Sequence, residues 1–138
     1  MVYETDDALD SDLRRYGCAF LSLAHYNPDF TDAQVNAIKA DALAKGIIDL
    51  EDSVQEWQRL VDLFGFPLKF RAPPATGHFP PETKLDVVAY VIGEWYNVFV
   101  SHFVVMDINN NVIYDPIEGG SNTVKMGHLV SYRLFDAV

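Results

Sequence analysis

The first half of the chain carries its apolar residues at the spacing of amphipathic helices. Residues 18–26 are apolar at this spacing and stop at an Asn-Pro pair, which breaks helices. A second helix is expected over residues 32–45, because Thr31 is a suitable N-cap and Gly46 a suitable end. The apolar stripe of this second helix comprises Val35, Ile38, Ala42 and Leu43.

A third helix is predicted over residues 53–64. Ser53 and Glu56 fit a capping box at its start, and Gly65 ends it. Its buried stripe is expected to contain Val54, Trp57, Leu60, Val61 and Phe64. The pattern therefore gives three helices in succession before any strand.

After Gly65 the pattern changes to runs rich in valine, phenylalanine, tyrosine and isoleucine, which are typical of strands. Strands are expected over residues 66–71, 85–95, 98–108, 112–115 and 127–135. Residues 72–84 contain four prolines and are expected to form a loop, and residues 109–111 to form the turn of a hairpin. Helices followed by antiparallel strands predict an α+β fold.

The length of 138 residues fits one domain, and no internal repeat or proline-rich linker divides it. We therefore expect residues 1–138 to fold as a single unit. A chain of this size buries roughly two thirds of its unfolded surface, so no disulfide or metal is needed to explain folding.

The charge of the chain narrows the range of partners. Ten basic and 20 acidic residues give a net charge of −10. Such a field repels phosphate backbones and anionic lipid headgroups, which argues against nucleic acid and membrane surfaces and favours cationic peptides. The same charge also keeps a domain in solution without any role in binding.

The N-terminal residues 1–15 are acidic and lack the apolar stretch of a signal peptide. No apolar run approaches the roughly 20 residues that a membrane-spanning helix needs. The expected location is the cytoplasm, and the single cysteine excludes an intramolecular disulfide.

That cysteine, Cys18, stands at the expected start of the first helix. The partial positive charge of a helix N-terminus stabilises a thiolate, lowers the thiol pKa and thereby favours a nucleophile. A small apolar thiol at the head of an apolar run is equally typical of core packing. The choice between the two depends on residues further along the chain.

His102 and Asp115 are those residues. His102 interrupts an apolar strand, where a polar ring without a partner costs about 1–3 kcal/mol. Pairing through the 109–111 turn places Asp115 opposite about residue 105, and a bulge or wider loop would bring it to His102. A carboxylate there would hold the imidazole in one orientation. The same residues are also explained without catalysis. His102 would then be a core histidine whose hydrogen bonds are made, and Asp115 an aspartate in a turn before proline.

Taken together, YGCAFLSLA (16–24), SHFVVM (101–106) and YDPIEGGSNTV (114–124) resemble the papain-like cysteine peptidase superfamily, above all its small C39-like branch in bacteria and phages. The last stretch, continued to residue 133, is also similar to small phage and spirochaete proteins that end in such a run. The resemblance implies a papain-like fold, with N-terminal helices packed on a C-terminal antiparallel sheet. It also implies Cys18 as nucleophile, His102 as general base and Asp115 as orienting acid.

One position departs from the pattern of these peptidases, which usually carry an oxyanion-binding glutamine about six residues before the cysteine. This chain has Asp12 there, an acceptor that would repel an oxyanion. Losing one oxyanion donor costs about 2.7–4 kcal/mol in a mutated hydrolase. The backbone N–H of Cys18 is an alternative donor, as are the side chains of Gln55 and Asn97.

The expected function is therefore a cysteine hydrolase that cleaves an amide or peptide bond, with peptidoglycan or a short, cationic peptide as substrate. Trp95, Tyr96 and His78 are candidates for lining a substrate groove. The histidines and the cysteine show no metal-ligand spacing, so neither metal nor cofactor is expected. Two alternatives stay open: a catalytically impaired fold that binds a protein or peptide, and acyl transfer or deamidation by the same triad.

Overall fold

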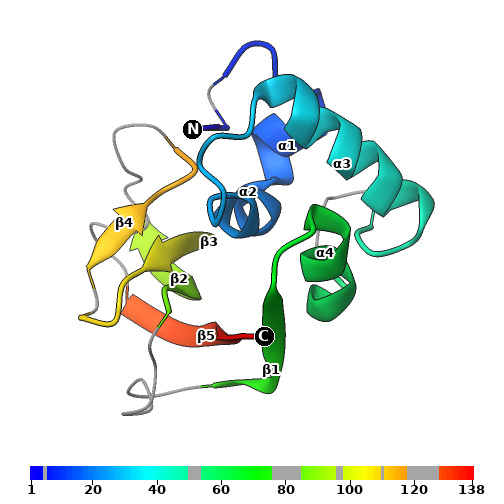
Figure 1. Ribbon diagram of the computed structural model, residues 1–138. Coiled ribbons are helices and arrows are strands. Elements are labelled where there is room, and N and C mark those ends of the chain that lie inside the picture. The colour runs from blue at the N-terminus through cyan, green and yellow to red at the C-terminus, as the bar shows by residue number, and fades with distance from the viewer. Residues whose placement is uncertain (5, 50–53, 76–84, 96–97, 110, 118–127) are drawn as a thin grey trace.

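The computed structural model describes residues 1–138 except 5, 50–53, 76–84, 96–97, 110 and 118–127. The side chains of residues 14–16, 72–75, 92–95, 98–101 and 128 also lie outside the description. Helices lie together on one side of an antiparallel sheet (Figure 1). The helices are α1 (Ser11–Tyr16), α2 (Cys18–Ala24), α3 (Asp32–Ala44) and α4 (Trp57–Phe64), and the strands are β1 (Leu68–Ala75), β2 (Val87–Trp95), β3 (Val98–Met106), β4 (Val112–Tyr114) and β5 (His128–Ala137). The predicted α+β class is confirmed.

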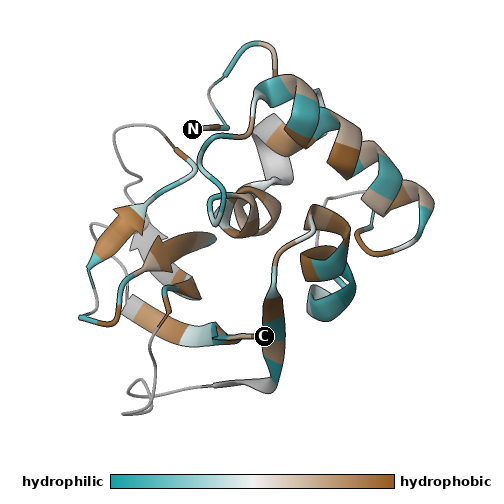
Figure 2. Cartoon of the chain, in the orientation of Figure 1, coloured by the Kyte–Doolittle hydropathy of each residue, from teal (hydrophilic) through white to brown (hydrophobic). Residues whose placement is uncertain are grey.

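Helix α1 was not expected from the sequence. Asp10 caps it by accepting hydrogen bonds from the backbone N–H groups of Asp12 (3.0 Å) and Leu13 (3.4 Å). Gly17 ends α1 and precedes α2, and its N–H donates to the carbonyl of Leu13. Helix α2 begins at Cys18, as predicted, and every residue from Ala19 to Ala24 is buried. Figure 2 shows α2 as a largely hydrophobic helix at the centre of the molecule.

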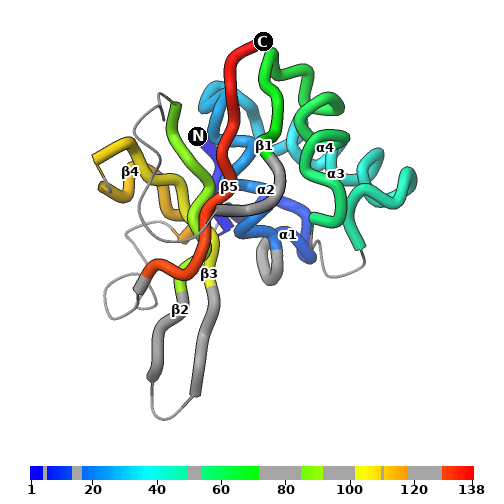
Figure 3. The backbone as a smooth tube through the Cα atoms, turned by 90° about the horizontal axis from the view of Figure 1, so that it is seen from below, coloured from blue at the N-terminus to red at the C-terminus, as the bar shows by residue number. Residues whose placement is uncertain are grey.

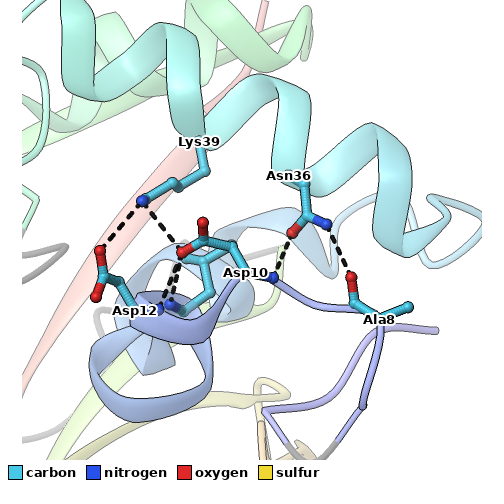
Figure 4. Close-up of polar contacts among 6 residues, drawn as sticks. Ala8, Asp10, Asp12, Asn36 and Lys39 are labelled. Atoms are coloured by element: carbon cyan, nitrogen blue, oxygen red, sulfur yellow. Dashed lines mark hydrogen bonds and ion pairs between the residues drawn. The ribbon is translucent and has the colours of Figure 1, made fainter.

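Helix α3 has the predicted start and end. Thr31 and Gln34 form a reciprocal capping box, and the chain leaves the helix through Gly46, whose φ of +70° favours glycine. Val35 and Ala42 are buried as expected, but so is Lys39. The ammonium of Lys39 lies 3.1 Å from Asp10 and 3.5 Å from Asp12, so these ion pairs join α3 to α1 (Figure 4).

Helix α4 is shorter than predicted. It begins at Trp57, after Glu56 as N-cap with no side-chain capping bond, so the predicted start near residue 53 is wrong. Val54 instead forms an isolated antiparallel bridge with Ile48, which extends the backbone ahead of the helix. The capping role predicted for Ser53 lies outside the described residues. Gly65 ends α4 with a φ of +78°.

The five strands form one antiparallel sheet in the order β1-β5-β2-β3-β4. Figure 3 shows β5 beside β1 and β2 beside β3. Strand β1 continues to Ala75, so the loop predicted over 72–84 begins later than expected. Proline is tolerated there because β1 is an edge strand and its pairing with β5 shifts register between Arg71 and Ala75.

The main core lies between the helices and the sheet. It includes Leu13 of α1, Phe20 of α2, Val88 of β2 and Val105 of β3, all at most 1% exposed. A second buried cluster contains Val87, Ala89, Val91, Val104, Met106, Tyr132 and Leu134. Among the described residues, no helix combines the length and apolar character required to cross a membrane.

Candidate functional site

The hairpin of β3 and β4 determines where His102 and Asp115 lie. Its turn is organised by Asp107, whose carboxylate accepts from the backbone N–H groups of Asn109 (2.8 Å) and Asn111 (3.0 Å). Val105 pairs with Tyr114, and the register shifts before Met106 pairs with Val112. Continued by one residue, the Val105–Tyr114 register places Asp115 opposite Val104, one residue nearer to His102 than counting from Asn110 predicts.

His102 and Asp115 are in direct contact. Nε2 of His102 lies 2.7 Å from Oδ1 of Asp115, and the two side chains are only 7% and 8% exposed. The same carboxylate oxygen accepts from the backbone N–H of Ile117 at 2.9 Å, which fixes its position. Since Nε2–H donates to Asp115, Nδ1 is the ring nitrogen available to other groups.

Cys18 reaches the same place from the first turn of α2, which packs against β3. Its sulfur lies within 4.8 Å of a ring nitrogen of His102. Cys18 is partly exposed, whereas the residues that follow it in α2 are buried. The structure thus brings together the three residues that the sequence proposed as a triad, with the sulfur at the accessible end.

The electrostatics of the site favour a protonated imidazole. Burial lowers the pKa of His102, but hydrogen bonds to Asp115 and Cys18 and the charges of both groups outweigh it and raise the pKa to about 10. An imidazolium is therefore the expected form of His102 at neutral pH. It is in contact with a buried carboxylate and lies within 4.8 Å of the Cys18 sulfur.

A fourth ionisable group, Glu4, was missed in the sequence. One of its carboxyl oxygens lies within 4.8 Å of both the Cys18 sulfur and a His102 nitrogen. Burial raises the pKa of Glu4 to about 7, with the charge of His102 lowering it and that of Asp115 raising it. No motif marks this residue, because its neighbours in space are distant in sequence.

The N-terminal segment is held in place by contacts with the end of β4. The backbone N–H of Glu4 donates to the carbonyl of Pro116 at 2.7 Å. The ring of Tyr114 stacks on those of Tyr3 (5.6 Å between centroids) and His25 (4.3 Å), and its hydroxyl donates to the carbonyl of Val2. Glu4 is thereby fixed next to Asp115 and the start of α2.

Asp12 does not take the place of an oxyanion-binding glutamine. Its carboxylate points to Lys39 on α3, and the 3.5 Å ion pair neutralises it there (Figure 4). Gln55, one alternative donor, directs its amide to Asp49 at 3.3 Å. Asn97 lies outside the described residues.

The groove residues proposed from the sequence stay predictions. His78 and Tyr96 lie outside the described residues, and of Trp95 only the backbone, at the end of β2, is described. Within the described part of the chain, Glu4, Cys18 and His102 are the group whose donor atoms are close enough to hold a metal ion. No metal-ligand spacing marks these three residues in the sequence, because they come from separate segments of the chain.

A family model described as "Protein of unknown function, DUF261" matches residues 1–137. The chain belongs to the DUF261 family. No curated protein and no solved structure matches this DUF261 chain. Function in this DUF261 protein has therefore to be argued from the contacts among Glu4, Cys18, His102 and Asp115.

Proposed function

We propose that this protein is a cysteine hydrolase that cleaves an amide or peptide bond with Cys18, His102 and Asp115. The observation that carries the proposal is the buried 2.7 Å contact between His102 and Asp115, with the Cys18 sulfur within 4.8 Å of a ring nitrogen of His102. A nucleophile, a base within reach and a third group that orients the base are the parts that covalent catalysis requires.

In the proposed reaction, the Cys18 thiolate attacks the carbonyl carbon of the substrate and forms a carbon–sulfur bond. The protonated ring of His102 then donates its proton to the leaving amine as the carbon–nitrogen bond breaks. Water next attacks the thioester, and His102 takes the proton that this water loses. The acid product leaves, and the thiolate and imidazolium are restored.

Asp115 has two roles in this scheme. It accepts Nε2–H, which directs Nδ1 toward Cys18, and its negative charge stabilises the imidazolium. The imidazolium in turn provides the counter-charge for a thiolate. The His102 pKa of about 10 keeps the imidazolium, which supplies this counter-charge, protonated at neutral pH.

The arrangement of elements supports a papain-like architecture. The nucleophile opens a helix that packs on the sheet, and the base and the orienting acid belong to a hairpin of that sheet. The chain order Cys18, His102, Asp115 is the order that the resemblance to C39-like peptidases implies. The net charge of −10 favours substrates with cationic side chains near the cleaved bond.

The test is hydrolysis of lysine- and arginine-containing fluorogenic peptide amides, with peptidoglycan fragments as a second substrate class. Wild-type protein should release product, and Cys18→Ala should not. A thioester on Cys18, located by mass spectrometry after an acid quench, demonstrates the covalent intermediate. The yield of acid product relative to that of the amide formed with an added amine separates hydrolysis from acyl transfer. Equal product release by wild type and Cys18→Ala would refute the proposal. Absence of both turnover and thioester on every substrate would favour a binding module.

A further inference from the structure

The carboxyl group of Glu4 has no part in the proposed hydrolysis, yet it is beside the sulfur. Glu4, Cys18 and His102 each contribute one donor atom to a cluster in which all three atoms lie within 4.8 Å of one another. One is an oxygen, one a sulfur and one a nitrogen. Glu4 and Cys18 are partly exposed and His102 is buried, so the group is open on one side.

We propose that Glu4, Cys18 and His102 bind a thiophilic divalent cation of the Zn²⁺ type, which covers the Cys18 sulfur and reversibly blocks its chemistry. The proposed metal site does not depend on the proposed hydrolase activity. The proposed inhibition of Cys18 chemistry by the metal does rest on that activity. The cation would take three protein ligands and leave a fourth position to water, as open zinc sites do.

The distances fit such an ion after a small adjustment. Bond lengths of Zn²⁺ to sulfur, nitrogen and oxygen place tetrahedral ligands about 3.4–3.6 Å apart. The observed separations of up to 4.8 Å require each donor to move inward by about an ångström or less. The Glu4 side chain can supply much of this movement because it rotates about three bonds.

The second contact of His102 also fits a metal ligand. Histidines that bind metals commonly donate their other ring N–H to a carboxylate, which fixes the tautomer. Asp115 accepts from Nε2 at 2.7 Å, so Nδ1 is the nitrogen that would bind the ion. The residue that orients a catalytic base is thus equally suited to orient a metal ligand.

The mixed donor set selects the class of ion. A thiolate and an imidazole favour Zn²⁺, Co²⁺ or Cu(I) over Mg²⁺ and Ca²⁺, which require several oxygen ligands. The net charge of −10 raises the local concentration of any cation. Sequence spacing could not reveal the site, because its ligands belong to the N-terminal segment, α2 and β3.

The experiment is titration of the full chain, stripped of metal by a chelator, with Co²⁺ and then with Zn²⁺. Added Co²⁺ should produce a thiolate-to-metal charge-transfer band that saturates at one equivalent of Co²⁺, and added Zn²⁺ should abolish this band. Cys18→Ser should lose the band, and Glu4→Gln should weaken binding by at least about 10–100-fold, the loss typical of removing a supporting partner. Glu56→Gln, at the exposed carboxylate of the residue just before α4, is the matched control and should bind as wild type does.

Equal Co²⁺ affinity in wild type and Glu4→Gln would overturn the site, provided that circular dichroism shows both proteins folded. If Glu4→Gln does not fold, Glu4→Asp replaces it, because the shortened carboxylate should change the Co²⁺ spectrum. Alkylation of Cys18 by iodoacetamide separates the two proposals. Saturating Zn²⁺ should slow alkylation at least tenfold in wild type, and unchanged alkylation would overturn the block. If the protein binds Zn²⁺ but its metal-free form hydrolyses no substrate, the proposed hydrolase is contradicted and the proposed metal site is not.

Discussion

Nε2 of His102 and Oδ1 of Asp115 lie 2.7 Å apart although 13 residues separate them in the chain. The pairing of β3 with β4 brings the two residues together, and both side chains are almost fully buried. A carboxylate in such a place has to be paired, since an isolated buried charge is strongly destabilising. The contact is therefore structural and, in our proposal, catalytic.

Replacing Asp115 by Asn separates these two roles. The amide retains Oδ1, which accepts from Ile117, but loses the negative charge. We expect the His102 pKa to fall from about 10, because its first stabilising contact is the hydrogen bond to Asp115. Hydrolysis should fall by about 10²–10⁴-fold, as for a wrongly oriented base. NMR titration of the His102 ring measures the pKa; an unchanged value would contradict this assignment.

Glu4 should make stability depend on pH between about 4.5 and 7. Its pKa is raised from 4.5 to about 7 in the folded chain, so the unfolded chain releases the proton first. The stabilisation is complete below pH 4.5 and is lost as pH rises through 7. With allowance for partial solvent screening, the loss is on the order of 2 kcal/mol. His102 makes stability depend on pH over a higher pH range, since its pKa in the folded chain is about 10.

Urea unfolding at pH 4.5 and 7.5, with a chelator present, measures this effect. Glu4→Gln carries no titrating group and should remove the Glu4 part of the difference. Glu56→Gln, at an exposed site, should leave the stability difference between the two pH values unchanged. If the wild type and Glu4→Gln lose equal stability over this range, Glu4 is not buried as described.

The two ion pairs of Lys39 should contribute unequally to the free energy of unfolding (Figure 4). Asp10 is the nearer partner and also caps α1, whereas Asp12 is more distant and half exposed. Asp10→Asn keeps the cap acceptor and should cost about 1 kcal/mol, and Asp10→Ala about 2 kcal/mol, since the cap is lost as well. Asp12→Asn should cost less than either. Urea denaturation ranks the variants; a larger loss for Asp12→Asn would reverse the assignment.

Gly17 should not tolerate a side chain. A Cβ at this position would lie 2.5 Å from the carbonyl oxygen and 2.9 Å from the Cα of Leu13, both backbone atoms. Gly17→Ala should therefore cost about 1–3 kcal/mol and displace the start of α2, with slower alkylation of Cys18. Ser11→Ala, at an exposed site of α1, is the comparison. Full stability in Gly17→Ala would mean that α1 and α2 are not packed this closely.

Periodicity predicted much of the fold because the apolar residues of α2, α3 and the strands follow one spacing for several turns or alternations. Helix α1 was missed because it is six residues long. Among its described side chains, Leu13 is the buried anchor, and the N-cap and the Lys39 ion pairs hold the helix. The start of α4 was misplaced because Ser53 and Glu56 match a capping pattern that Val54 overrides by bridging to Ile48.

The site was partly predictable for a similar reason. Cys18, His102 and Asp115 stand in recognisable local sequences, and a hairpin confines the last two to neighbouring strands. Glu4 belongs to no such pattern; it reaches the sulfur through the packing of the N-terminal segment on Tyr114 and Pro116. The burial of Lys39 likewise depends on α1, which the sequence did not predict.

The most direct test of the triad is the pH dependence of Cys18 alkylation by iodoacetamide in metal-free wild type and His102→Ala. The single cysteine makes the rate specific to Cys18. If His102 supplies the counter-charge, His102→Ala should react at least tenfold more slowly than wild type at pH 6, and the two rates should converge as the pH rises. Identical rate profiles for the two proteins, both folded, would show that the thiol is merely exposed and would contradict the proposed function.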